Sequence, residues 1–165
     1  MKLFADTANI KEIEKLLESG AIQGITTNPS LLAKEPKTDF YSHIQKICNL
    51  CTAYGVDLPI SVEVFATEPD KMIDQAIEIS KKVQYKNLNI KIPVGFNELK
   101  VIHKLSQNGI RVNCTCCFTE TQLELAALSG ARYVSLFYNR LKDVGGNPEE
   151  VLNGNLDKFI EGNIF

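Results

Sequence analysis

The stretch LNIKIPV at residues 88–94 places one lysine, Lys91, between two isoleucines and two residues before Pro93. Short apolar runs of this kind are typical of strands buried within a parallel sheet. A primary amine in such a strand has two explanations. Lys91 lies at an edge and extends its ammonium group to water, or it lies inside, where an amine can serve as a nucleophile. The sequence on either side of this stretch distinguishes the two.

Short apolar runs alternate with amphipathic helical patterns along most of the chain, and Lys91 lies in the fourth of six such runs. Strands that alternate with helices predict βα units and a parallel sheet. Gly109 and Gly130 follow two of the predicted helices, as glycines that end helices do. The predicted strands are 2–6, 23–26, 58–65, 87–92, 110–117 and 131–137, and the predicted helices are 9–19, 38–54, 68–83, 97–107 and 119–128.

The alternation weakens after Phe137, and this bounds the predicted domain. Residues 139–147 are predicted to form a loop, and one short helix is expected near residues 156–161 of the polar, asparagine-rich tail. No repeat or linker indicates a second domain. We therefore predict an α/β domain of about six βα units around a parallel sheet, over residues 1–147. A short polar C-terminal tail or helix follows over residues 148–165.

Three consecutive predicted strands each place a polar pair on one face. The pairs are Ser61 with Glu63, Asn89 with Lys91, and Asn113 with Thr115, while Asp6, Thr26 and Asn28 lie near other strand ends. Residues two apart in a strand share a face, and in a (βα)8 barrel functional groups gather at the carboxyl ends of the strands. An antiparallel sheet with one wet face would alternate in the same way, but the intervening helices argue against it. We therefore expect Lys91 to lie inside.

The composition of the chain excludes several classes of function. It is 44% hydrophobic and 23% charged with a formal net charge of −2, which gives no electrostatic reason to expect nucleic acid or a membrane as a partner. No apolar run reaches the roughly 18 residues that span a bilayer, and the N-terminus becomes polar too early for a signal peptide. Five cysteines in this setting indicate reduced thiols and a cytoplasmic protein. A second CxxC pair is missing, so we expect buried thiols and no metal site.

A lysine beside carboxylates suggests imine chemistry. A lysine attacks a carbonyl only as the free amine. Breaking the neighbouring C–C bond then requires groups that accept and return protons. Asp6 and Glu63 can do this, with Thr115 and nearby amides as uncharged orienting groups. Spacing alone therefore suggests a Schiff-base aldolase, while a structural salt bridge between Lys91 and Glu63 stays open as an alternative.

Six segments of the chain resemble small transaldolases and fructose-6-phosphate aldolases. They occur in the family's order and at similar spacing over residues 1–147, and TTNPS together with the lysine strand is the most specific part. The resemblance implies a (βα)8 barrel that acts on sugar phosphates without cofactor or metal, as a cytoplasmic homo-oligomer. The segments are DT at 6–7, GITTNPSLL at 24–32, EVFAT at 63–67, IKIPV at 90–94, NCT at 113–115 and YVSLFYNR at 133–140.

The resemblance implies roles for four catalytic residues. Lys91 matches the Schiff-base lysine, and Asp6 matches the acid/base that deprotonates the donor hydroxyl during C–C cleavage. Glu63 and Thr115 match the pair that holds a proton-relaying water in transaldolases. Fructose-6-phosphate aldolases carry glutamine in place of Glu63 and tyrosine in place of Phe137. The resemblance therefore favours transfer of a dihydroxyacetone unit from a ketose phosphate to an aldose phosphate.

Six positions match residues that bind substrate in the family. Asn28 would contact substrate hydroxyls or the lysine, and Arg140 would grip a phosphate as a planar, permanently charged donor. The full set is Thr26, Asn28, Asn113, Ser135, Phe137 and Arg140. The resemblance implies neither a metal ligand nor a cofactor.

The resemblance is incomplete on its C-terminal side. A (βα)8 barrel takes about 250 residues and family members continue for about two more βα units, whereas this chain has 165 residues. The family's serine-bearing strand-seven motif, a second phosphate grip, has no counterpart here. We therefore expect a barrel that is truncated or completed by another chain, such as a second copy. The substrate would be a sugar phosphate or a short ketose such as dihydroxyacetone.

Two other classes of function stay open from the sequence. A catalytically impaired family member would bind a sugar or carbonyl compound, and that binding would survive Lys91→Ala. An assembly partner would instead form a defined hetero-oligomer with no dependence on a small molecule. His43 and His103 fall within predicted helices, away from the strand ends, and we expect packing roles for both.

Overall fold

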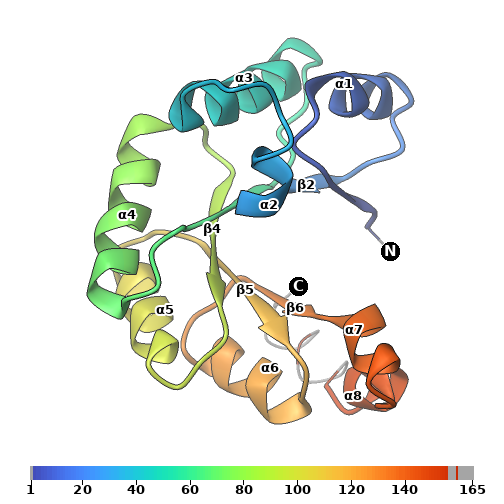
Figure 1. Ribbon diagram of the computed structural model, residues 1–165, viewed down its shortest axis with the longest axis vertical. Coiled ribbons are helices and arrows are strands. Elements are labelled where there is room, and N and C mark those ends of the chain that lie inside the picture. The colour runs from blue at the N-terminus through green and yellow to red at the C-terminus, as the bar shows by residue number, and fades with distance from the viewer. Residues whose placement is uncertain (1, 156–158, 160–165) are drawn as a thin grey trace. The chain divides into compact units, whose positions relative to one another are not determined.

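The computed structural model describes residues 2–155 and residue 159 (Figure 1). The described residues form the strands β1 (Phe4–Asp6), β2 (Gly24–Thr26), β3 (Ile60–Glu63), β4 (Leu88–Pro93), β5 (Val112–Cys117) and β6 (Tyr133–Leu136). They form the helices α1 (Ile10–Glu18), α2 (Pro29–Leu32), α3 (Phe40–Ala53), α4 (Pro69–Lys82), α5 (Glu98–Gln107), α6 (Glu120–Leu128), α7 (Tyr138–Asp143) and α8 (Pro148–Asn153). The predicted strands and helices up to residue 137 are all present, each within two residues of its expected bounds.

The strands follow one another in the sheet in the order of the sequence, β1-β2-β3-β4-β5-β6. β1 pairs with β2, β2 with β3, and β5 with β6, all in parallel. Parallel neighbours need a crossover connection, and a helix supplies it in each case. The prediction of an α/β fold is therefore confirmed: the described residues form six consecutive βα units of the (βα)8 TIM-barrel type.

The chain forms two compact units. The first unit contains residues 1–65 and 74–90, and the second contains residues 66–73 and 91–165. Helix α4 and strand β4 contribute residues to both.

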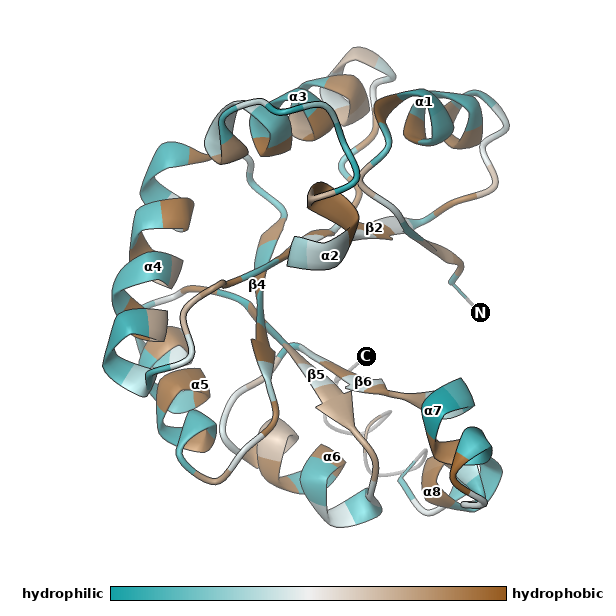
Figure 2. Cartoon of the chain, viewed as in Figure 1, coloured by the Kyte–Doolittle hydropathy of each residue, from teal (hydrophilic) through white to brown (hydrophobic). Residues whose placement is uncertain are grey.

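The core of the first unit lies against the buried faces of α1 and α3, which contact each other. α1 buries Ile13 and Leu17, one helical turn apart. Along α3, hydrophilic and hydrophobic residues alternate (Figure 2), and the buried ones recur every three or four positions, as on an amphipathic helix. These are His43, Ile44, Ile47, Cys48 and Cys51. A histidine therefore lies within an otherwise apolar stripe of the core.

Side-chain caps begin the two long helices of the first unit. Asn9 Oδ1 accepts from the backbone N–H groups of Lys11 and Glu12, both at 3.1 Å, at the start of α1. Asp39 accepts from the backbone N–H of Ser42 at 2.9 Å at the start of α3. Caps of this kind satisfy backbone N–H groups that have no partner inside the helix. The Asn9 cap also fixes where the chain turns into α1 after β1.

The second unit contains an irregular strand, β5. Cys114 pairs with Val134 and Cys117 pairs with Leu136, so β5 has one more residue than β6 between the two pairs. The extra residue is a β-bulge, and Cys116 within it has a φ of 66°, in the left-handed region that non-glycine residues rarely adopt. Because bulges change the direction of the side chains beside them, the end of β5 just after Thr115 departs from simple alternation.

Three short helices differ from the prediction. α2 (Pro29–Leu32) was not predicted, although Asn28 caps it and proline occupies its first turn, because four residues are too few to show a helical period. α7 (Tyr138–Asp143) overlaps the loop predicted over residues 139–147, so that prediction was wrong for residues 139–143. α8 (Pro148–Asn153) lies in the predicted tail. Of the helix expected near 156–161, only residue 159 belongs to the described residues.

Candidate active site

Lys91 lies in the interior, as predicted. It is 7% exposed, and Asn89, Ile90 and Ile92 of the same strand are completely buried. Because side chains at 89 and 91 point to the face opposite those at 90 and 92, both faces of β4 are covered. An edge lysine with its ammonium group in water would be exposed, so that interpretation of Lys91 is excluded.

Two predicted site residues of the first unit contact each other directly. Asp6 and Thr26 are the last residues of β1 and β2, and the parallel register sets them opposite one another. Thr26 Oγ1 donates a hydrogen bond to Asp6 Oδ1 at 2.8 Å. This hydrogen bond orients the exposed Asp6 carboxylate through one of its oxygens. An oriented carboxylate is suited to take up a proton.

Asn28 lies just after β2, and Glu63 ends β3 in the same unit. Glu63 is the last residue of β3 and is half-buried. Asn28 Oδ1 accepts from the backbone N–H of Leu31 at 3.0 Å and so caps α2. Its oxygen is therefore used in the fold, and its Nδ2 group is the part of the side chain suited to donate to a ligand.

The second unit joins Asn113 and Ser135. Asn113 is 3% exposed and lies on the same face of β5 as Thr115, which is 2% exposed. Ser135 Oγ, on the neighbouring strand β6, donates to Asn113 Oδ1 at 2.8 Å. The backbone carbonyl of Thr115 accepts from Val94 N at 2.8 Å, just after β4. The polar residues predicted on β5 and β6 thus lie next to one another.

Phe137 and Arg140 occupy the start of α7. The Phe137 ring packs edge-on against Phe118, with ring centroids 5.7 Å apart, and its backbone N–H donates to the carbonyl of Cys117 at 2.8 Å. Arg140 is exposed, in the third position of the helix. An exposed guanidinium can bind an anion without first breaking a buried contact.

Over residues 2–155 and 159, no set of three or more His, Cys, Asp or Glu side chains is arranged to hold a metal ion. Within the same residues, each helix is too short or too polar to cross a bilayer. The five cysteines are free thiols. Cys114 and Cys117 lie 3.9 Å apart, Sγ to Sγ, and the hydrogen bond from Cys114 lowers the pKa of Cys117.

Comparison with known proteins gives a consistent result. A family model described as transaldolase/fructose-6-phosphate aldolase matches residues 3–160. A "probable transaldolase" of Clostridium botulinum (strain Hall) is 46% identical over 159 residues, which are 96% of this chain and 70% of the relative. A "probable transaldolase" of Dehalococcoides mccartyi is 44% identical over 153 residues, 93% of this chain and 68% of the relative.

A solved structure supports the fold alone. The crystal structure of a candidate phosphonomutase from Burkholderia cenocepacia J2315 aligns with a TM-score of 0.60 at 15% identity. The alignment covers 96% of this chain and 71% of that structure.

Proposed function

Because the chain belongs to the transaldolase/fructose-6-phosphate aldolase family, we propose that it is a transaldolase-like class I aldolase whose Lys91 forms a Schiff base with a ketose phosphate or dihydroxyacetone. The observation that carries this proposal is the position of Lys91, 7% exposed in the middle of β4. A nucleophilic lysine held away from bulk water forms an imine that is protected from uncontrolled hydrolysis.

The first step joins Lys91 to the donor. The amine adds to the ketone carbonyl, the carbinolamine loses water, and a protonated imine remains. One water molecule leaves for each imine that forms, and protons move from nitrogen to the departing oxygen. Glu63 and Thr115 would each take part in relaying these protons through water. The burial of Thr115, 2% exposed, supports a role at an enclosed site.

The second step breaks the C–C bond. The Asp6 carboxylate takes the proton from the donor hydroxyl on the carbon beyond that bond, and the bond's electrons move into the protonated imine. An aldehyde leaves and an enamine stays on Lys91. The acceptor aldehyde then adds to the enamine by the reverse steps, and hydrolysis frees the amine. The hydrogen bond from Thr26 to Asp6 supports this assignment because it orients the carboxylate.

The donor and acceptor would be bound by polar groups around these residues. Thr26 and Asn28 would contact the donor, and Asn113 and Ser135 are further proposed substrate-binding positions. Arg140 would bind a phosphate group, and its exposure supports contact with a ligand. Glu63 and Phe137 favour the transaldolase reaction over simple aldol cleavage.

Borohydride reduction tests the proposal directly. The protein is incubated with dihydroxyacetone, or separately with fructose 6-phosphate, and is then reduced and digested. Peptide mass spectrometry is expected to find a stable adduct on Lys91, and Lys91→Ala is expected to show none. Lys86→Ala is a matched control, since Lys86 is exposed just before β4.

The outcomes separate the possible functions. An adduct confined to Lys91 supports the aldolase. Folded protein that forms no adduct contradicts it. Binding of fructose 6-phosphate that is unchanged in Lys91→Ala would instead favour a sugar or carbonyl binder.

A further inference from the structure

The segment after Asp6 is held by hydrogen bonds at successive residues. Thr7 N donates to the backbone carbonyl of Thr26 at 3.0 Å, next to the Thr26–Asp6 contact. Thr7 Oγ1 accepts from Asn9 N at 3.1 Å and donates to Glu12 at 2.6 Å. The backbone that carries the Asp6 side chain is thus tied to β2 on one side and to α1 on the other.

His43 makes a third connection to this segment. His43 Nε2 lies 2.8 Å from the backbone carbonyl oxygen of Ala8, and His43 is 35 residues further along the chain. A carbonyl can only accept, so Nε2 must carry the proton and donate. Both residues are buried, with Ala8 1% and His43 8% exposed. A donor at this place is therefore costly to remove, because a buried carbonyl would lose its partner.

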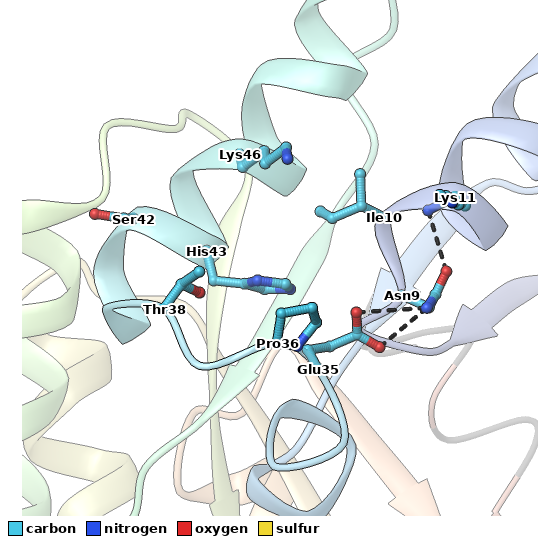
Figure 3. Close-up of a pocket in the computed structure, with 9 residues that line it drawn as sticks. All are labelled: Asn9, Ile10, Lys11, Glu35, Pro36, Thr38, Ser42, His43 and Lys46. Carbon is cyan, nitrogen blue, oxygen red and sulfur yellow. Dashed lines mark hydrogen bonds between the residues drawn. The ribbon is translucent and has the colours of Figure 1, made fainter.

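A cavity borders the same connection. It has a volume of about 540 Å³ and is lined by His43, Asn9, Glu35 and Lys46, among others. Figure 3 shows His43 reaching from α3 toward Pro36 and Glu35, and the bonds from Asn9 to Glu35 are marked. Asn9 Nδ2 donates to the Glu35 carboxylate at 3.1 and 3.4 Å while Asn9 Oδ1 caps α1. Glu35, in the segment before α3, thus holds Asn9 at the start of α1, and His43 of α3 holds the neighbouring Ala8.

We propose that His43 is a positioning residue for Asp6. Its Nε2–H group holds Ala8, two residues after Asp6, and so fixes the direction in which the Asp6 carboxylate leaves β1. The inference rests on the proposed function, in which Asp6 takes a proton during C–C cleavage. It assigns to His43 a role beyond packing in the apolar stripe of α3.

The alternative is that His43 only fills space. Leucine is apolar and of similar bulk, and it fits a stripe that already contains Ile44 and Ile47. Glutamine carries an Nε2 donor at about the distance of the imidazole Nε2. The pair His43→Leu and His43→Gln therefore separates packing from hydrogen bonding, and His103→Leu on the exposed face of α5 is the matched control.

The experiment compares two steps that need different residues. Imine formation is measured by borohydride capture of dihydroxyacetone on Lys91. Cleavage is measured as the release of the aldehyde from fructose 6-phosphate. A misplacement of about 1 Å can lower a rate about 100-fold. His43→Leu is therefore expected to lower cleavage about 10- to 100-fold while imine capture stays within about twofold. His43→Gln is expected to recover most of the loss, and His103→Leu to change neither step.

A second measurement needs no activity. Amide hydrogen exchange of the peptide covering residues 4–12 is expected to quicken at least about tenfold in His43→Leu, since the segment loses a buried hydrogen bond that opposes its local opening. Exchange in the second unit should be unchanged, which excludes general unfolding. His43→Gln is expected to restore protection. Added imidazole is expected to restore it in His43→Ala, because the cavity beside His43 admits a small molecule.

The outcomes keep this inference separate from the proposed function. If the unaltered protein forms no imine, the aldolase assignment fails, while the exchange data still test the contact between His43 and Ala8. If His43→Leu and His43→Gln behave alike in both measurements, the positioning role is wrong. If imine capture falls together with cleavage, the effect is a general loss of structure and the inference is also overturned.

Discussion

Asp6 and Thr26 are brought together by strand register and not by proximity in the sequence. They are 20 residues apart, and the parallel pairing of β1 with β2 places them opposite one another at the ends of their strands. A hydrogen bond to a charged group is worth about 1.5–3 kcal/mol. The Thr26 hydroxyl is therefore strong enough to hold the Asp6 carboxylate in one orientation.

Thr26→Val tests this orientation, since valine has nearly the shape of threonine and lacks the hydroxyl. We expect the rate of fructose 6-phosphate cleavage to fall about tenfold, which corresponds to about 1.4 kcal/mol. Borohydride capture on Lys91 should stay within about twofold, because imine formation does not use the Asp6 proton. Thr121→Val, on an exposed position of α6, is the control. Equal cleavage rates in Thr26→Val and the unaltered protein would show that the hydroxyl does not serve Asp6.

Glycines end both α5 and α6, and the structure requires them for partly different reasons. Gly109 follows α5 with a φ of 74°, and Gly130 follows α6 with a φ of 101°. A side chain is strained at both angles. A Cβ atom at Gly109 would meet nothing within 4 Å, whereas one at Gly130 would lie 2.5 Å from Ser106 Oγ and 2.8 Å from Ser106 Cβ. Gly130 therefore also permits a close approach between two helices.

The two glycines should respond differently to replacement by alanine. Gly109→Ala is expected to lower the free energy of unfolding by about 1 kcal/mol, the cost of the left-handed conformation. Gly130→Ala is expected to lower the free energy of unfolding by about 1–3 kcal/mol more than Gly109→Ala does, because Ser106 must move. Urea unfolding followed by circular dichroism measures both values. If the two variants lose the same free energy of unfolding, Ser106 can move aside without an energetic cost.

The short elements limit what periodicity can predict. α2 has four residues and α7 has six, and neither completes two helical turns. α7 begins at Tyr138 without a side-chain cap, so the usual signal for a helix start is also missing. The long elements were predicted because their period repeats several times.

At the scale of the whole molecule, the first unit buries ionisable groups in its core as well as apolar ones. Cys48 and Cys51 are completely buried on α3. Burial raises the pKa of Cys48 to about 12 and also raises the pKa of Cys51. Burial likewise raises the pKa of Tyr85, whose hydroxyl donates to the carbonyl of Leu58 at 2.8 Å. Neutral thiols and a neutral phenol are therefore part of the folded state.

Alkaline pH is expected to destabilise the protein through these groups. The ordinary pKa of a cysteine thiol is 9.0, and the pKa of Cys48 in the folded protein is about 12. Below pH 9 Cys48 is protonated in both the folded and the unfolded chain, and its contribution to stability is complete. Between these values the unfolded chain loses the proton first, and stability falls by up to about 1.4 kcal/mol per pH unit for each such group. Urea unfolding at pH 8 to 11 should show this slope. Cys48→Ala should show a shallower one, and parallel slopes would contradict the assignment.

Sequence patterns were enough to predict the αβ alternation, the positions of the long strands and helices, and the interior place of Lys91. Each of these follows from local geometry, since side chains alternate in a strand and recur every three or four residues in a helix. Strand ends and faces pointed to Asp6, Thr26 and Asn113 as polar site residues, and the family resemblance added Ser135; the structure pairs Asp6 with Thr26 and Asn113 with Ser135. Their strands are neighbours in the chain, and consecutive βα units pair in order.

The remaining features depend on contacts that form only in the folded chain. The contact of His43 with Ala8 joins residues 35 apart, and no period in the sequence encodes such a partner, so we had expected only packing for His43. The bulge at Cys116 arises because β5 has one residue more than β6 between two pairs, which depends on a neighbouring strand. Each of these features involves two separate segments of the chain. Packing and hydrogen bonding bring the two segments together when the chain folds.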